Sequence, residues 1–528
     1  MKRKLIYSLV GLSLALGSCS DYLDVNENPN SATAASAPLV LPQAIVSSAN
    51  LASAFNNYGG NLGGNIANAG GFAGFGSVIS YSFTSSDYAG LFSASYANLK
   101  DYEYVFQQTP AATDKYFHAA ARTMKVFVYQ KLVDTYNDVP YSEGVKGADA
   151  VTPKYDKASD IYKALILQCD TAIAEITAGQ AAAVSPIGLT SDTDPLFKGD
   201  MNRWKKFANT LKLSLLIRAQ KSTDLTAAVN AGFSSFNTTV GVLVDDAIVN
   251  PGYLKQDGRQ NPIWNTYAYP ATSTTVQGSG RSRIPTRWML TFYNGSKLTD
   301  NARAGVIYRG GSTIATVNQL GNEISVPNAP TGYPAWFTGA TPTTESLGVL
   351  KGPTQGMPLV LAAEAQFLLA ESRLIGKVTG LAKASFDAGI VASFNYLYKN
   401  SSDALGVGKT PTTDATSYQA ANAGIYLANY DAALTDAQRL EAIITQKYIA
   451  VNMVNNDTGW NEYRRTGFPK IVNGSTNGTQ TFASLVSTAT AADKLPTRVL
   501  YPTTEFSYNP GNVPSGVSAF TTKIFWAK

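Results

Sequence analysis

Two glutamates on one predicted helix offer the acid–base chemistry that a hydrolase requires. Glu364 and Glu371 lie seven residues apart, so both fall on the helix face that also carries Phe367. A glycoside hydrolase needs only such a pair of carboxylates. Buried carboxylates also need partners, and Arg464 and Arg465 are available further along the chain. Catalysis and structural ion pairs with these arginines are therefore both possible interpretations, and the sequence favours the ion pairs.

Other kinds of catalysis lack the residues that they need. His118 is the only histidine, so the chain offers a single histidine for a zinc site or a Ser-His-Asp triad. The tripeptide Gly408-Lys409-Thr410 ends like a phosphate-binding loop, but Asp403 stands where that loop requires its first glycine. The sequence predicts no enzyme activity, no cofactor and no metal site.

Aromatic side chains are the residues in this chain that are best suited to binding. The chain contains 29 Tyr and 6 Trp, while charged residues make up only 15%. This balance suits an uncharged polar ligand, because Tyr and Trp present a rigid apolar face with one polar group. A sugar ring stacks on such faces, and its hydroxyls form hydrogen bonds with Asn, Gln, Asp and Arg.

Residues 253–293 interleave aromatic and polar side chains, and two further aromatic clusters lie elsewhere in the sequence. We predict that the ligand-binding residues are Trp264, Asn265, Tyr267, Tyr269, Arg281, Arg283, Tyr333, Trp336 and Tyr88. The alternative is that these aromatics only pin long loops to the helices.

The charge balance argues against nucleic acid as a ligand. Lys and Arg total 42, and Asp and Glu total 37. Lys2, Arg3 and Lys4 belong to an N-terminal signal, which leaves 39 positive against 37 negative residues. No lysine- or arginine-rich run stands out, so the electrostatic signature of nucleic-acid binding is missing.

The N-terminal residues have the pattern of a secretory signal. Residues 2–4 are basic and residues 5–16 are apolar, but this stretch is too short for a membrane-spanning helix, which needs about 20 residues. The Leu-Gly-Ser-Cys of residues 16–19 resembles the lipobox of bacterial lipoproteins. The resemblance implies a cleaved signal peptide, residues 1–18, and lipidation of Cys19. An ordinary secretory signal with an incidental cysteine is the alternative.

A lipid on Cys19 would anchor the protein at a membrane without a transmembrane helix, and we expect no such helix further along. The polar residues 19–36 are predicted to form a tether. Cys169 is the only other cysteine, so lipidation leaves no possible intramolecular disulfide.

Helical periodicity dominates the remaining chain. The predicted helices are residues 88–108, 111–137, 156–178, 200–221, 357–375, 382–398 and 435–455. Residues 240–245 and 303–317 are the best short strand candidates, and residues 59–76 and 250–356 read as long ordered loops. We predict an all-α dominated fold of helical hairpins with long loops and few short strands.

Several blocks resemble motifs of SusD/RagB-like nutrient-binding outer-membrane lipoproteins. They follow the family order at residues 134–143, 204–213, 363–371, 446–450, 460–469, 495–502 and 523–526. Asn137 stands where glycine is commoner in the family, and residues 300–303 replace its usual Asp-Pro-Arg, so that turn is expected to differ.

This resemblance implies one SusD-like domain, residues 37–528, built on about four pairs of TPR-like helices. It also implies a lipid-anchored outer-membrane protein that faces the cell exterior and caps a TonB-dependent, SusC-like transporter. Ser20, Asp21 and Asp24 look like the acidic export signal of such lipoproteins. The implied ligand is an oligosaccharide or a peptide, with an oligosaccharide favoured by the aromatic composition. A surface glycoside hydrolase or other hydrolase is the alternative function.

Overall fold

The structure is a computed structural model that describes residues 35–72, 75–110, 113–322, 328 and 330–528. The predicted signal peptide and Cys19 lie outside the described residues, as does all but the end of the predicted tether. Helices dominate the described part of the chain, and the few strands are three or four residues long. The predicted fold class is therefore confirmed.

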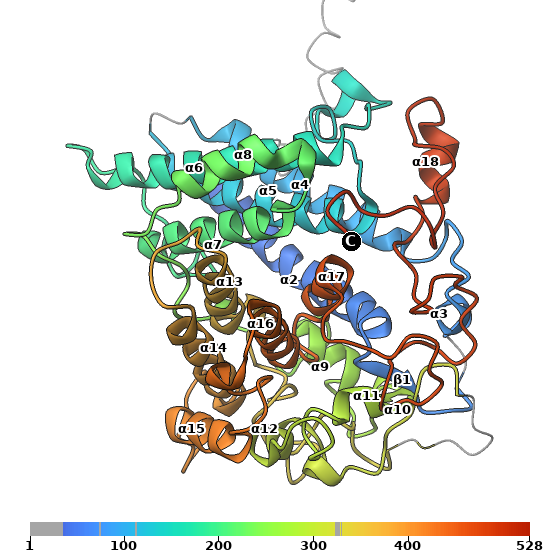
Figure 1. Cartoon of the computed structure of the whole chain (residues 1–528). Helices are drawn as coiled ribbons and strands as arrows, with labels where there is room; N and C mark the ends of the chain where they lie inside the picture. Colours follow the sequence, from blue (N-terminus) through green and yellow to red (C-terminus); the bar gives the residue numbers. More distant parts are fainter. Residues whose placement is uncertain (1–34, 73–74, 111–112, 323–327, 329) are drawn as a thin grey trace, which may run out of the picture.

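The first half of the chain forms a consecutive stack of helices. Its long helices are α2 (Ala37–Leu62), α4 (Ala89–Gln108), α5 (Lys115–Tyr136), α6 (Ala158–Gln180), α7 (Met201–Ala219) and α8 (Thr226–Ser234). Each of α4 to α7 packs against the next one, as hairpins joined by loops (Figure 1). Asp200 begins α7 by accepting hydrogen bonds from the backbone N–H groups of Asn202 and Arg203 at 2.9 and 3.1 Å, which satisfies donors that the helix leaves free.

A second group of helices continues the stack. It consists of α13 (Ala362–Leu374), α14 (Ala382–Tyr398), α15 (Pro411–Ala421), α16 (Asp436–Ala450) and α17 (Asn456–Thr466). Helix α13 packs on α7, which joins the two groups, and α17 returns to pack on α2 (Figure 1). The Thr435 hydroxyl caps α16 by accepting from Gln438 N–H at 3.2 Å, which satisfies a backbone donor in the first turn of the helix.

Helix α2 is apolar and lies in the core. By length and composition it could cross a membrane, but half of its most apolar window is buried inside the protein. It packs against α4, α5 and α17. Gly59 permits the contact with α17, because a Cβ at this position would lie 2.0 Å from the backbone nitrogen of Asp457. The burial identifies α2 as a core helix of the fold.

Two small antiparallel sheets connect the long loops to this helical body. Strand β1 (Ile66–Asn68) pairs with β3 (Arg283–Pro285), and β2 (Ala247–Val249) pairs with β4 (Met357–Val360). The strands predicted at residues 240–245 and 303–317 are wrong. Residues 301–307 form helix α12 (Asn301–Ile307) instead, because Asp300 caps its first turn by accepting from Arg303 N–H at 3.0 Å.

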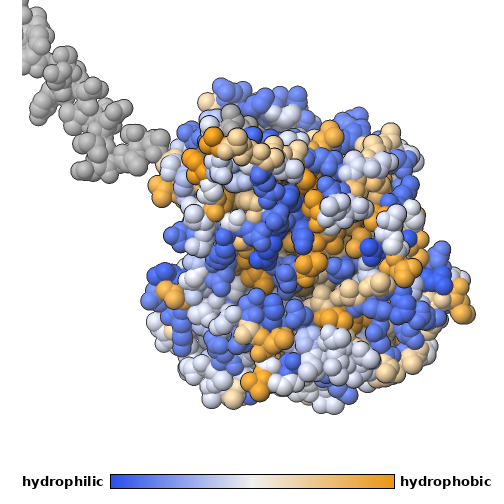
Figure 2. Space-filling view, turned by 90° about the vertical axis from the view of Figure 1, so that its left-hand side faces the viewer, coloured by the Kyte–Doolittle hydropathy of each residue, from blue (hydrophilic) through white to orange (hydrophobic). Residues whose placement is uncertain are grey.

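Short helices occupy the remaining loops. They are α3 (Gly76–Ser80), α9 (Pro262–Tyr267), α10 (Gly278–Ser282), α11 (Arg287–Leu290), α18 (Thr503–Tyr508), η1 (Gly147–Ala150), η2 (Thr223–Leu225), η3 (Gly311–Thr313) and η4 (Tyr430–Ala432). On the face drawn in Figure 2, hydrophobic residues are interspersed with hydrophilic ones. This face therefore has the mixed character of a water-exposed surface.

Candidate ligand site

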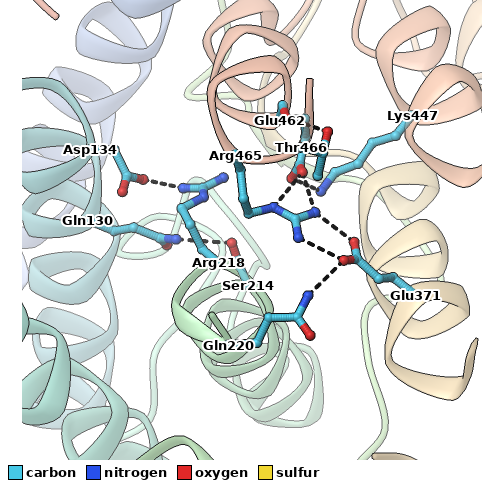
Figure 3. Close-up of polar contacts among 10 residues, drawn as sticks. All are labelled: Gln130, Asp134, Ser214, Arg218, Gln220, Glu371, Lys447, Glu462, Arg465 and Thr466. Atoms are coloured by element: carbon cyan, nitrogen blue, oxygen red, sulfur yellow. Dashed lines mark hydrogen bonds and ion pairs between the residues drawn. The ribbon is translucent and has the colours of Figure 1, made fainter. Parts of the chain in front are cut away.

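Two of the four glutamate and arginine residues singled out in the sequence, Glu371 and Arg465, meet in a buried ion-pair network (Figure 3). Arg465 from α17 donates two hydrogen bonds, both at 2.7 Å, to the two carboxylate oxygens of Glu371 from α13. Arg465 also pairs with Glu462, which in turn binds Lys447 at 2.7 Å. Gln220 adds a hydrogen bond to Glu371 at 3.0 Å. The predicted ion pair between Glu371 and Arg465 is present in the structure.

Electrostatics explain why this network stays ionised. Burial opposes the charge on Glu462, but Arg465 and Lys447 outweigh burial and hold the pKa of Glu462 well below its ordinary value. Glu371 is 1% exposed. A carboxylate fixed by a bidentate arginine and closed off from solvent cannot act as an acid or nucleophile on a sugar.

The predicted ion pairs of Glu364 and Arg464 are wrong. Glu364 accepts hydrogen bonds from Leu361 N–H at 3.0 Å and from the Asn455 amide at 2.7 Å, and burial raises its pKa. Arg464 donates to the backbone carbonyls of Thr497 and Asp134 at 3.1 and 2.6 Å. Neutral donors at Glu364 and neutral acceptors at Arg464 replace the expected charges, because these side chains point to different neighbours than Glu371 and Arg465.

The cavity beside Glu364 is too small for a substrate. Its volume is about 50 Å³, and its lining includes Asp134, Arg218 and Lys447. A ligand pocket in a protein usually measures about 300 Å³ or more, whereas the smaller volume suffices for water. The two glutamates therefore lack the open cleft that glycoside hydrolysis needs.

Four of the five aromatics predicted as ligand contacts in residues 264–336 are buried. Trp264, Tyr267, Tyr269 and Trp336 are between 0% and 3% exposed. Their predicted role as direct ligand contacts is therefore wrong, and the alternative of loop packing holds for them. Burying a large ring contributes more to stability than leaving it on a solvated loop, which explains why these loops fold inward.

Ring contacts show how these aromatics hold the loops together. Trp264 meets Phe337 edge-to-face at 5.5 Å between ring centroids, and Tyr267 meets Trp336 at 5.8 Å in the same way. The Tyr267 hydroxyl also donates to the side-chain oxygen of Asn57 at 2.9 Å. This hydrogen bond fixes the short helix α9 against the long helix α2.

A polar pocket of about 350 Å³ lies between α2, α9 and α10, and we call it the α2–α9 pocket. Its lining consists of Asn50, Ser53, Ala54, Asn57, Pro262, Asn265, Thr266, Ser279 and Arg283. Two predicted ligand residues, Asn265 and Arg283, are thus brought together in one site. Its volume lies within the usual range for small-molecule sites.

Helix geometry explains why these residues share a wall. The four α2 positions that line the pocket are spaced at i, i+3, i+4 and i+7, and those of α9 at i, i+3 and i+4, so each set forms one helix face. Asn261 begins α9 by accepting from Trp264 N–H at 3.0 Å. Helix α10 approaches the end of α9 closely because residue 280 is glycine, where a Cβ would lie 2.0 Å from the Tyr267 carbonyl oxygen.

Arg283 is the charged residue of the α2–α9 pocket. Its guanidinium lies over the Phe75 ring at 5.2 Å, and within the described residues no carboxylate comes within 4.0 Å of it. Its buried Nε donates to no described acceptor. Burial raises the pKa of Tyr267 to about 12, and the Arg283 charge opposes this rise. Arg283 therefore keeps hydrogen-bonding capacity for an acceptor oxygen of a ligand.

The other predicted ligand residues lie outside this lining. Arg281 is exposed and lies 5.8 Å from the Phe72 ring centroid. Tyr333 is half-buried, stacks on Phe337 and donates to the Ala340 carbonyl at 3.1 Å. Tyr88 is half-buried at the start of α4, and Arg283 acts on its pKa, which burial raises. None of these three lines the α2–α9 pocket.

Helix α2 contributes pocket residues that are not among those predicted from the sequence. Asn50, Ser53 and Asn57 interrupt an otherwise apolar helix at helical spacing. That polar stripe was the available signal, but the helix itself was not predicted.

Comparisons with known proteins agree on the fold. A family model for SusD-like proteins, described as "Starch-binding associating with outer membrane", matches residues 29–502. A SusD homologue from Bacteroides uniformis is 24% identical and covers 93% of this chain and 99% of its own, with a TM-score of 0.68. A chitin-binding SusD homologue from Flavobacterium johnsoniae is 20% identical and covers 91% and 98%, with a TM-score of 0.65. A SusD homologue from Bacteroides fragilis is 17% identical and covers 94% and 100%, with a TM-score of 0.64. No curated protein matches the sequence.

Proposed function

The chain belongs to the SusD-like family, and from this membership we propose that it binds an oligosaccharide at the outer membrane and passes it to a partner transporter. The α2–α9 pocket is the proposed binding site. Arg283 and Asn265 are its proposed principal contacts.

The observation that carries this proposal is the chemistry of the pocket lining. Three amides, three hydroxyls and one arginine surround the cavity, and the arginine has no carboxylate partner among the described residues. A sugar hydroxyl both donates and accepts hydrogen bonds, and such side chains supply both partners. The family description names starch, and a related structure is described as chitin-binding, which supports a glycan as the ligand class.

A peptide is the other ligand that the pocket chemistry can accept. Arg283 would then bind a terminal carboxylate, because its guanidinium has no acidic partner among the described residues. Calorimetry with both ligand classes separates these two possibilities.

We further propose that residues 37–528 act as one binding domain, anchored through a lipid on Cys19 and facing the cell exterior. The transporter partner would be a TonB-dependent, SusC-like barrel, as the resemblance of the sequence implies. No catalysis is proposed, because Glu371 is fixed by Arg465 and Glu364 faces a cavity of about 50 Å³.

The test is calorimetry of the purified protein with maltoheptaose, chitohexaose and a peptide of similar size. For the oligosaccharide that binds, Arg283→Ala should weaken the affinity at least about tenfold, since a hydrogen bond to a charged group contributes about 1.5–3 kcal/mol. Asn265→Ala should weaken it by a smaller factor. The matched control is Arg281→Ala, an exposed arginine near the pocket but outside its lining, which should stay within about twofold of wild type.

Binding of Arg283→Ala at wild-type affinity would show that the α2–α9 pocket is not the site. Binding of the peptide alone would replace the glycan with a peptide. Release of new reducing ends from either glycan would instead support the hydrolase alternative.

A further inference from the structure

A second cavity lies on the helical hairpins, away from the lining of the α2–α9 pocket. It has a volume of about 290 Å³ and is enclosed by α4, α5, α6 and residues 141–146. We call it the hairpin pocket and define it by Glu103, Arg122, Lys125, Tyr129, Tyr141 and Gln168. It shares no residue with the α2–α9 pocket.

The charged side chains of the hairpin pocket already have partners. Arg122 donates to Glu175 at 3.1 Å from Nε and at 2.9 Å from Nη2, and also to the Gln168 side chain. Lys125 forms an ion pair with Glu103. The remaining lysine of the lining, Lys146, is exposed and acts electrostatically on Glu143. The lining therefore presents both donors and acceptors without a large surplus charge.

The inner wall of the pocket contains a hydroxyl that has no hydrogen-bond partner in the described part of the chain. Tyr129 on α5 is 1% exposed, and its hydroxyl bonds to none of the described residues. The half-buried Tyr141 packs edge-on against the Tyr129 ring at 4.8 Å between centroids. Buried hydroxyls normally have a partner in the native state, and no described residue supplies one, so the Tyr129 hydroxyl keeps the capacity to form a hydrogen bond with a molecule in the pocket.

We propose that the hairpin pocket is a second carbohydrate site, which binds one neutral sugar unit. Paired carboxylates and cations offer acceptors and donors side by side, as sugar hydroxyls require. A charged ligand would have to compete with the existing ion pairs. The ring of Tyr141 supplies apolar surface for the C–H groups of the sugar.

This second site goes beyond the proposed function, because it does not depend on the α2–α9 pocket. Two sites on one protein would hold one polysaccharide at two points. Such linkage raises the overall affinity without any new contact at either site.

The test uses Arg283→Ala protein, so that the α2–α9 pocket does not contribute, and follows binding of glucose and N-acetylglucosamine by ligand-observed NMR titration. We expect saturable binding that becomes about tenfold weaker when Tyr129→Phe is added, because one hydrogen bond to the sugar is lost. The matched control is Tyr104→Phe on α4, whose hydroxyl binds the Ala35 carbonyl at 2.8 Å outside the pocket. It should leave the affinity unchanged.

A melting curve of each variant separates binding from folding. Tyr129→Phe should melt at or above the temperature of its parent, because the unliganded protein loses an unsatisfied buried hydroxyl. Absence of saturable binding of both sugars, or equal affinity with and without Tyr129→Phe, would overturn the proposal. Tighter binding of glucuronate than of glucose would overturn the neutral character of the site. Sugar binding that Arg283→Ala leaves unchanged and Tyr129→Phe weakens would count against the α2–α9 pocket alone.

Discussion

Replacing Glu371 with glutamine should destabilise the protein without touching either proposed sugar site. Glu371 accepts two hydrogen bonds from Arg465 at 2.7 Å and one from Gln220 at 3.0 Å. A glutamine keeps one acceptor oxygen, but its amide nitrogen then faces Arg465 or Gln220, which are both donors.

The magnitude follows from the charges of the network. Glu371 and Glu462 balance Arg465 and Lys447, so Glu371→Gln leaves one uncompensated positive charge in a region that is at most 5% exposed. Breaking a buried ion pair costs about 3–5 kcal/mol. Because Glu462 still binds Arg465, we expect a loss near the lower end, about 3 kcal/mol of unfolding free energy.

The assay is urea denaturation followed by tryptophan fluorescence, with ligand affinity measured in parallel. The control is Asp160→Asn, whose ion pair with Lys163 is on the surface and should contribute about 1 kcal/mol or less. Equal losses for the two variants would refute the assignment of Glu371 as a buried structural anion. Unchanged stability together with lost ligand binding would show that Glu371 belongs to a binding site and is not a structural residue.

Three further predictions concern the core, the anchor and acid stability. Trp264→Ala should lower the unfolding free energy by about 3–5 kcal/mol, because Trp264 is 3% exposed; a wild-type denaturation curve would contradict its burial. In membrane fractionation, Cys19→Ala should give soluble protein or uncleaved precursor, and normal membrane retention of this variant would contradict the predicted lipid anchor. The unfolding free energy should fall as the pH drops below about 4.5, the ordinary pKa of Glu462. The reason is that Glu462 takes up a proton in the unfolded state, while its pKa in the folded state is held far lower. Urea midpoints that do not change between about pH 5 and about pH 3 would contradict this prediction.

Long helices with regular periodicity were the part of the fold that the sequence predicted well. The predicted segment 382–398 coincides with α14, and 156–178 corresponds to α6 (Ala158–Gln180). Helix α2 is not among the predicted helices, because Pro42 lies inside it and Gly59 and Gly60 lie near its end, and both residue types weaken a helical pattern. Residues 357–360 were assigned to the following helix, but they pair with β2 as strand β4. A partner strand more than a hundred residues away decides such a boundary.

The candidate site was predicted only in part. Asn265 and Arg283 were named from the interleaving of aromatic and polar residues, and both line the α2–α9 pocket. Trp264 and Tyr267 belong to the same segment, yet they turn into the core. In residues 253–293 the spacing of aromatic residues does not distinguish the buried side of a loop from the open side.

The sequence by itself determined the helix-dominated fold class, the family and the pairing chemistry available to Glu371 and Arg465, because periodicity, motif order and side-chain charge are properties of the chain. Only the tertiary structure decided that Glu364 binds neutral donors, that Arg464 binds neutral acceptors, and that four predicted contact rings are buried. It also decided that Asn50, Ser53 and Asn57 complete a pocket with residues more than 200 positions later in the sequence. The physical reason is that burial and partner choice depend on which distant segments pack together. Local sequence fixes the type of each side chain but not the surface against which it lies.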